Sequence, residues 1–144
     1  MLNSFTVSFK IYSNKTNYRF KLSKRMNTNN ADTVFCATVL YPFLDNTSFD
    51  FDHYVNVLIP EYVKLLGDNC VRYEVRKGLT SPGANHIQFI CIANFWIRSG
   101  EQFGAAMAKP EIKEIMQKIA AFTDIQPIRQ FDEVLISVIR SQTT

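Results

Sequence analysis

The chain has no long apolar run and only two histidines, and these absences exclude several classes of protein. No uninterrupted apolar stretch approaches the ~18 residues that would cross a bilayer, and the N-terminus lacks the continuous apolar core of a secretory signal. Neither His53 nor His86 stands at a spacing that would pair it with a cysteine as a metal ligand. We therefore expect no membrane span and no metal site.

Cysteine is also scarce. The three cysteines, Cys36, Cys70 and Cys91, are odd in number, and Cys36 and Cys91 fall inside strand-like apolar runs. Buried, unpaired thiols in a reducing compartment account for this pattern, so we expect a cytoplasmic protein.

Acidic residues are missing from residues 1–31, which hold 6 of the 16 Lys and Arg residues. The other 10 basic residues stand against all 13 acids, so residues 32–144 carry a net charge of −3. A mildly acidic body lacks the electrostatic footprint of a nucleic-acid-binding domain. Residues 86–97 also lack the exposed aromatic spacing of an RNA-binding sheet, so no nucleic-acid partner is expected.

The basic extension at 1–31 shows no helical period. Its apolar residues alternate on either side of turn-forming residues 14–16, which favours a β-hairpin without a strong Asn-Gly turn. Three interpretations fit: an extension that the domain does not need, with Met26 as the natural start; a hairpin that docks on the domain; or a targeting segment. The targeting segment is the least favoured of the three, because a mitochondrial leader forms an amphipathic helix and this segment shows no helical period. The domain itself is expected at 32–144.

The domain alternates between strand and helix patterns. Period-two segments predict strands at 33–41, 70–79, 86–97 and 127–138. Three- and four-residue periods predict one helix over 50–66 and a second from the capping box at Ser99 onward. In the first helix, Asp50 is the expected cap, Gly67 the expected end, and Pro60 should kink or restart the helix near Leu58. Its expected buried stripe is Phe51, Tyr54, Leu58, Tyr62 and Leu65.

The order β-α-β-β-α-β predicts an α+β, ferredoxin-like antiparallel sheet with two helices on one face. The strand at 86–97 is apolar on both faces except for Gln88 and Asn94: Ile90, Ile92 and Trp96 lie on one face, and Ile87, Phe89, Cys91, Ala93, Phe95 and Ile97 lie on the other. Leaving either set in water would expose a large apolar patch. Pairing two sheets across a two-fold axis removes it, so we expect a homodimeric barrel. A monomer with residues 1–25 over the open face is the competing solution. The charged set at 72, 74 and 76 is expected near a rim or sheet edge.

Two motifs resemble those of a known family. Leu40-Tyr41-Pro42 followed by Phe49-Asp50-Phe51-Asp52-His53-Tyr54-Val55-Asn56-Val57-Leu58-Ile59-Pro60 resembles the signature of the EthD-type dimeric α+β barrel proteins. Weaker matches at 78–79, 93–99 and 122–127 extend the resemblance over roughly residues 33–137. It implies a dimeric α+β barrel from a family associated with ether degradation and grouped with oxidoreductases. Similar barrels include cofactor-free monooxygenases, isomerases and lyases.

The resemblance places the family's histidine at Leu58. An imidazole there could take a proton near neutral pH, whereas leucine cannot. His53 is no substitute, because five residues along a helix rotate a side chain by about 140°. Asp50 and Asp52 are explained as a cap and a helix-dipole acid without a metal.

The residues expected to line a pocket are Tyr41, Tyr54, Leu58, Trp96 and His86. Ordinary core packing is the alternative for the tyrosines and Trp96, and loop anchoring is the alternative for His86. The first hypothesis is a small-molecule-binding barrel that uses no cofactor, an oxidoreductase or lyase acting on an apolar or aromatic compound. The second is a non-catalytic homodimer whose pocket is filled.

Overall fold

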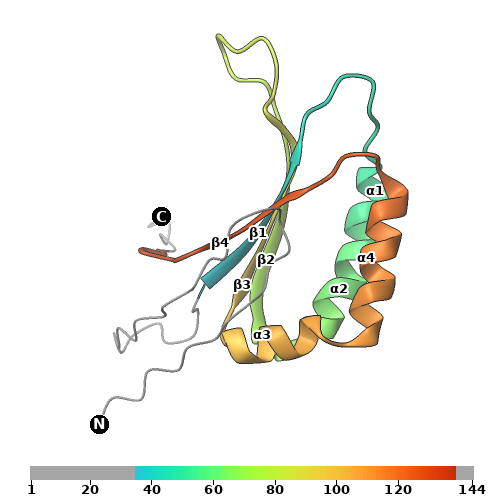
Figure 1. Ribbon diagram of the computed structural model, residues 1–144. Coiled ribbons are helices and arrows are strands. Elements are labelled where there is room, and N and C mark those ends of the chain that lie inside the picture. The colour runs from blue at the N-terminus through green and yellow to red at the C-terminus, as the bar shows by residue number, and fades with distance from the viewer. Residues whose placement is uncertain (1–34, 139–144) are drawn as a thin grey trace, which may run out of the picture.

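In the computed structural model, a twisted four-stranded sheet carries its helices on one face (Figure 1). The structure describes residues 35–138. The basic extension at 1–31 and its expected hairpin lie outside this range. Within residues 35–138, every helix falls short of the length and hydrophobicity that a bilayer crossing needs.

The elements follow the predicted order. They are β1 (Phe35–Pro42), α1 (Phe51–His53), the π-helical turn η1 (Tyr54–Leu58), α2 (Ile59–Leu66), the 3₁₀ turn η2 (Gly67–Asn69), β2 (Cys70–Lys77), β3 (Phe89–Ile97), α3 (Gly100–Met107), α4 (Pro110–Phe122) and β4 (Ile128–Asp132). The strand order is β2-β3-β1-β4, and all three pairings are antiparallel. This is the expected α+β, ferredoxin-like arrangement. The charged set of β2 lies on an edge strand.

The two faces of the sheet differ as period two predicts. On the face that α2, α3 and α4 cover, β1 and β3 supply these residues to the core: Phe35, Ala37, Tyr41, Cys91, Ala93, Phe95 and Ile97. We call the other side the open face. In β3 it carries Ile90, Ile92, Asn94 and Trp96.

The expected interruption at Pro60 is a π-helical turn. Proline has no N–H, and its ring would collide with the carbonyl of Asn56 in a continuous α-helix. The chain adopts η1 directly before it, and the Ile59 N–H bonds to the Tyr54 carbonyl, one residue farther than in an α-helix. The wider turn rotates the residues that follow, so Leu66 is buried where Leu65 was expected, and Leu65 is only partly buried.

The helices begin and end at the capping residues that the sequence predicted. The Asp50 carboxylate accepts a hydrogen bond from the His53 N–H at 3.0 Å, and the Ser99 hydroxyl accepts one from the Gln102 N–H at 3.3 Å. Gly67 ends α2 with a φ of 57°, a conformation that favours glycine. The second helical region is two helices rather than one, because α3 stops before Pro110 and α4 begins there.

The last strand is shorter than predicted. β4 ends at Asp132, which pairs with Cys36, and no described strand runs beside residues 133–138. A strand exists only where a neighbour satisfies its backbone groups, so the apolar pattern after Asp132 stays unpaired. Leu135, Ile136 and Val138 are 85%, 82% and 70% exposed.

Candidate functional site

Three of the five candidate pocket residues meet between the sheet and η1. Tyr41 reaches in from β1, and Tyr54 and Leu58 reach in from η1; their exposed fractions are 1%, 2% and 0%. The rings of Tyr41 and Tyr54 meet edge to face with centroids 5.6 Å apart. Tyr54 also stacks on Phe122, at 5.4 Å between centroids. Tyr62 and Cys91 lie in the same core. We use the name tyrosine cluster for Tyr41, Tyr54, Leu58, Tyr62 and Cys91.

The side chains of Tyr41 and Tyr54 are close enough for a hydrogen bond between them to affect the pKa of both phenols. Burial raises the pKa of both phenols. For Tyr41, the hydrogen bond from Tyr54 and the positive charge of Arg129 oppose this rise in pKa. Both phenols are therefore neutral near pH 7. They can donate hydrogen bonds, but they are poor proton acceptors.

Tyr62 and Cys91 complete the cluster, although neither was a pocket candidate. The Tyr62 hydroxyl contacts the Met107 sulfur at 3.9 Å, and its ring meets Phe95 edge to face at 4.9 Å. Burial raises the pKa of the Tyr62 phenol, and it raises the pKa of the Cys91 thiol to about 12. The available signal was the four-residue spacing that links Tyr54, Leu58 and Tyr62. It predicts a shared helix face but not which strand residue that face meets.

This arrangement offers little acid-base chemistry. The surrounding side chains are apolar and aromatic, and the polar groups of the cluster are neutral hydroxyls and a protonated thiol. Leu58, where the resemblance places a histidine, has no exposed surface. Among residues 35–138 no group of three potential metal ligands comes together. His53 lies outside the cluster as an exposed residue near the start of the helix.

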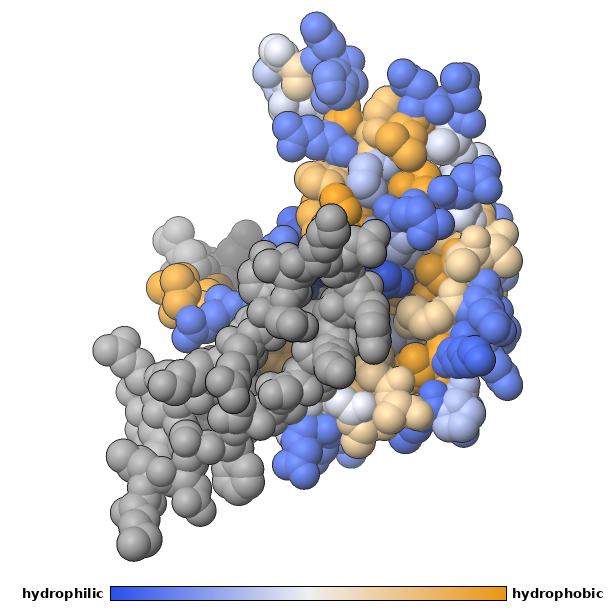
Figure 2. All heavy atoms as spheres, viewed as in Figure 1, coloured by the Kyte–Doolittle hydropathy of each residue, from blue (hydrophilic) through white to orange (hydrophobic). Residues whose placement is uncertain are grey.

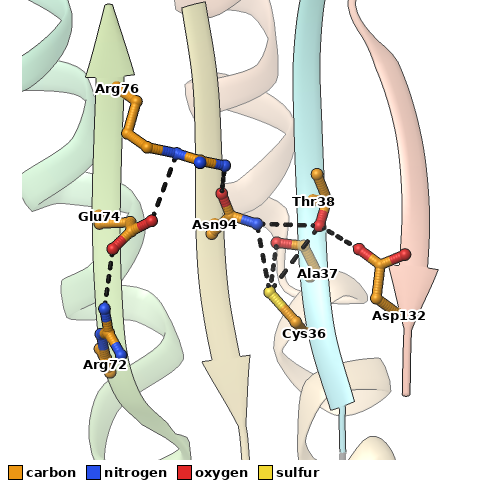
Figure 3. A network of polar contacts seen from close by, with 8 residues as sticks. All are labelled: Cys36, Ala37, Thr38, Arg72, Glu74, Arg76, Asn94 and Asp132. Carbon is orange, nitrogen blue, oxygen red and sulfur yellow. Dashed lines mark hydrogen bonds and ion pairs between the residues drawn. The ribbon is translucent and has the colours of Figure 1, made fainter. Parts of the chain in front are cut away.

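Trp96 lies on the open face, away from the tyrosine cluster. The Arg72 guanidinium covers its ring at 4.3 Å. Beside it a polar network crosses all four strands (Figure 3). Its contacts run Arg72–Glu74 (2.8 Å), Glu74–Arg76 (3.3 Å), Arg76–Asn94 (3.0 Å), Asn94–Thr38 (3.1 Å) and Thr38–Asp132 (2.5 Å). Sequence reasoning missed this network, because cross-strand contacts depend on strand register.

His86 occupies a third place, in the hairpin between β2 and β3. It is exposed and helps to line a cavity of about 330 Å³. The lining residues are Gly78, Leu79, Ser81, Ala84, His86, Ile87, Gln88, Phe89 and Ile92. The five candidates therefore do not form one site. The tyrosine cluster joins Tyr41, Tyr54 and Leu58, whereas Trp96 and His86 lie apart from it.

The sequence and the fold of this chain also match those of known proteins. The sequence pattern of the EthD domain family matches residues 47–126. The chain is similar to an EthD-like protein from Ralstonia eutropha JMP134, with 32% identity over 72% of this chain and 94% of that one, and a TM-score of 0.66. It also resembles an EthD family protein from Bacillus halodurans C-125, with 18% identity, 69% and 96% coverage and a TM-score of 0.55. A dimeric ferredoxin-like protein of unknown function from Thermobifida fusca YX matches at 14% identity, 76% and 99% coverage and a TM-score of 0.48. No protein with a curated description matches the chain.

Proposed function

The chain belongs to the EthD domain family, and on this basis we propose that it is a homodimeric α+β barrel that binds a small apolar or aromatic molecule at the tyrosine cluster. The observation that carries the proposal is the contact of two buried phenols, Tyr41 and Tyr54, in otherwise apolar surroundings. Apolar walls with a few placed polar groups are typical of small-molecule sites. A ligand with a carbonyl oxygen would take the place of one hydroxyl as the partner of the other.

The chemistry open to such a ligand is restricted. A neutral phenol can stabilise negative charge that develops on a ligand oxygen, but it does not remove a proton near pH 7. Cofactor-free oxidoreductase or lyase activity at this cluster would therefore depend on a substrate that ionises readily. Tyr41 and Tyr54 would act as hydrogen-bond donors. We accordingly propose binding as the primary role.

A filled, non-catalytic pocket is the second candidate, and the burial of Leu58 favours it. Leu58 is 0% exposed and sits within the continuous core that contains Tyr54 and Tyr62. In a packed interior, a ligand must displace side chains before it can enter. Under this candidate the leucine simply packs, and the chain serves as a homodimeric structural or binding protein.

The homodimer is supported by the open face. Ile90, Ile92 and Trp96 are only half-buried there, and Ile128 on β4 is 51% exposed. Apolar side chains gathered on one sheet face are typical of an interface. Light scattering coupled to gel filtration should give twice the mass of one chain. A monomer at micromolar concentration would refute the homodimer.

Thermal melting with and without ligand separates the two functional candidates. The panel consists of quinones, naphthols and alkyl-substituted aromatic compounds. Under the binding proposal the wild type melts at a higher temperature with at least one compound, and Tyr54→Phe reduces this shift. Under the filled-pocket candidate the wild type shows no shift. Leu58→Ala then gains one with small aromatic compounds, because truncation opens an apolar cavity.

Restoring an imidazole tests the missing reaction. Leu58→His should create or raise turnover of a compound that the wild type binds, whereas Val57→His, at a 39% exposed position of the same turn, should not. Equal activity in both variants, or none in either, would argue against a latent active site at position 58.

A further inference from the structure

The hairpin between β2 and β3 forms a cavity of its own. The hairpin loop spans residues 78–88 and extends beyond the end of the sheet, at the top of Figure 1. The cavity has a volume of about 330 Å³, and its lining combines loop residues with Phe89 and Ile92 of β3. We call it the hairpin cavity. None of the residues of the tyrosine cluster, all of which the structure describes, belongs to this lining.

The tip of the hairpin is a type II turn. The Ala84 N–H donates a hydrogen bond to the Ser81 carbonyl at 3.0 Å. Pro82 stands at the second position of the turn, and Gly83, with a φ of 83°, stands at the third, as this turn type requires. Ser81 and Ala84 both line the cavity, so the turn fixes two of its lining residues.

Two further backbone hydrogen bonds hold the base of the hairpin. The Gly78 N–H donates to the Ile90 carbonyl at 2.9 Å, and the Phe43 N–H donates to the Gln88 carbonyl at 2.8 Å. Gly78 and Gln88 also line the cavity. The cavity is therefore built on backbone that is already ordered, which lowers the entropic cost of binding a ligand.

The lining side chains define the chemistry of a suitable ligand. Four of them are apolar: Leu79, Ile87, Phe89 and Ile92. Three can both donate and accept hydrogen bonds: Ser81, His86 and Gln88. Among the described residues that line the cavity, none is Asp, Glu, Lys or Arg. A neutral ligand with an apolar body and an oxygen atom fits this set, because a charged ligand would find no permanent counter-charge.

The polar and apolar parts of the hairpin lie at different heights. Figure 2 shows mainly hydrophilic residues at the tip and apolar residues below it, where the hairpin meets the sheet. Ser81 belongs to the turn at the tip, whereas Phe89 and Ile92 belong to β3. A ligand would therefore place its apolar part toward the sheet and its oxygen toward the tip. It would also cover Leu79, which is 83% exposed.

The volume limits the ligand to one or two rings. A cavity of about 150 Å³ holds benzene. The hairpin cavity, at about 330 Å³, is roughly twice as large as that. It has room for a substituted single ring or for two fused rings.

We propose that the hairpin cavity is a second binding site, which takes a neutral compound of one or two rings that carries a hydroxyl or carbonyl oxygen. The rings pack on Ile87, Phe89 and Ile92, and the oxygen forms hydrogen bonds with His86 and Gln88. This site goes beyond the function proposed for the tyrosine cluster and does not depend on it.

Amide NMR on the full chain tests the site with three compounds that differ in one group. 4-Ethylphenol, which is neutral and carries an oxygen, should shift the signals of residues 78–92 in a saturable manner. Ethylbenzene lacks the oxygen and 4-ethylbenzoate is charged, so each should bind about tenfold more weakly or less. No shift in residues 78–92 with 4-ethylphenol up to its solubility limit, or equal binding of the three compounds, would overturn the proposal.

The contribution of the imidazole has its own variant. His86→Leu should weaken the binding of 4-ethylphenol about fivefold to tenfold, because a hydrogen bond to the ligand oxygen is lost. Asn85→Leu, at the neighbouring exposed position outside the lining, is the matched control and should bind as the wild type does. Equal affinities of the two variants would contradict the proposed contact.

The apolar side of the site is tested at an exposed residue, whose replacement leaves the core intact. Leu79→Ser should weaken 4-ethylphenol binding about fivefold, because apolar surface that the ligand covers is removed. Leu135→Ser changes a leucine of nearly the same exposure, 85% against 83%, outside the cavity and should have no effect. Wild-type affinity in Leu79→Ser would count against the proposed site.

The outcomes separate this site from the tyrosine cluster. Shifts in residues 78–92 that Tyr54→Phe leaves unchanged support the hairpin site, whatever the tyrosine cluster binds. Shifts confined to the surroundings of Tyr41 and Tyr54, and abolished by Tyr54→Phe, support the function proposed above and overturn the hairpin site.

Discussion

The rings of Tyr41 and Tyr54 meet edge to face in the core, with centroids 5.6 Å apart, although one residue belongs to a strand and the other to a π-helical turn. Pro60 explains why this contact involves a π-helical turn. The turn lies directly before the proline, and it sets the direction in which Tyr54 and Leu58 point into the core. The same local feature thus positions the candidate polar pair and the leucine beside it.

We expect the two phenols to be energetically coupled. Tyr54→Phe removes one hydroxyl of this buried pair and leaves the Tyr41 hydroxyl without that neighbour, so the free energy of unfolding should fall by about 1–2 kcal/mol. The double change Tyr41→Phe with Tyr54→Phe should be less destabilising than the sum of the single changes, by at least about 0.5 kcal/mol. Urea unfolding of the four proteins completes the cycle. Strict additivity would show that the hydroxyls do not interact.

Truncating the Leu58 side chain should strongly lower the free energy of unfolding. Leu58→Ala removes three buried carbons from a fully enclosed position, so we expect a loss of about 2–5 kcal/mol in the free energy of unfolding. Val57→Ala, one residue earlier and partly exposed, should change it by no more than about 0.5 kcal/mol. A loss near 1 kcal/mol for Leu58→Ala would indicate that a cavity already lies beside the leucine, which favours the binding proposal over the filled pocket.

Stability should fall in alkaline solution through Cys91. Burial raises the pKa of this thiol from its ordinary value of 9.0 to about 12, so the unfolded chain loses the proton first. The contribution is intact below pH 9 and declines as pH rises toward 12, by about 1.4 kcal/mol for each pH unit. Urea unfolding between pH 8 and 11 measures the decline. Cys91→Ala should flatten it by that amount, and an unchanged slope in this variant would contradict the assignment.

Gly78 should be irreplaceable for a steric reason. A Cβ at this position would collide with the Phe89 carbonyl oxygen, which is backbone and has little freedom to move. We expect Gly78→Ala to destabilise the protein by about 2 kcal/mol or more. Gly83→Ala is the matched control in the same hairpin: its φ of 83° strains alanine, but the space around it is open, so about 1 kcal/mol is expected. Similar losses in the two variants would show that the contact at Phe89 relaxes.

Much of the fold was predictable because it depends on local periodicity. Alternation along β1 and β3 separated the side chains of the two sheet faces, and Asp50, Gly67 and Ser99 marked helix ends through their own hydrogen bonds or backbone conformation. The end of β4 was predicted wrongly, since residues 133–138 have strand-like composition but no described neighbour.

The candidate site was predictable only in part. Its shared helix face follows from the spacing of Tyr54 and Leu58, and the contribution of Tyr41 follows from the alternation of β1. The separation of Trp96 and His86 from that cluster was not predictable, because it depends on which face and which end of the sheet each strand position occupies after folding.

Local chemistry in the chain therefore settled the order of the elements, the caps, the interruption at Pro60 and the absence of an imidazole at position 58. Only the folded chain decided that the rings of Tyr41 and Tyr54 meet, that Leu58 is buried in the core, and that Asp132 and the arginines of β2 occupy opposite edges of one face. These relationships join residues far apart in sequence. They depend on strand register and helix packing, which no local pattern specifies.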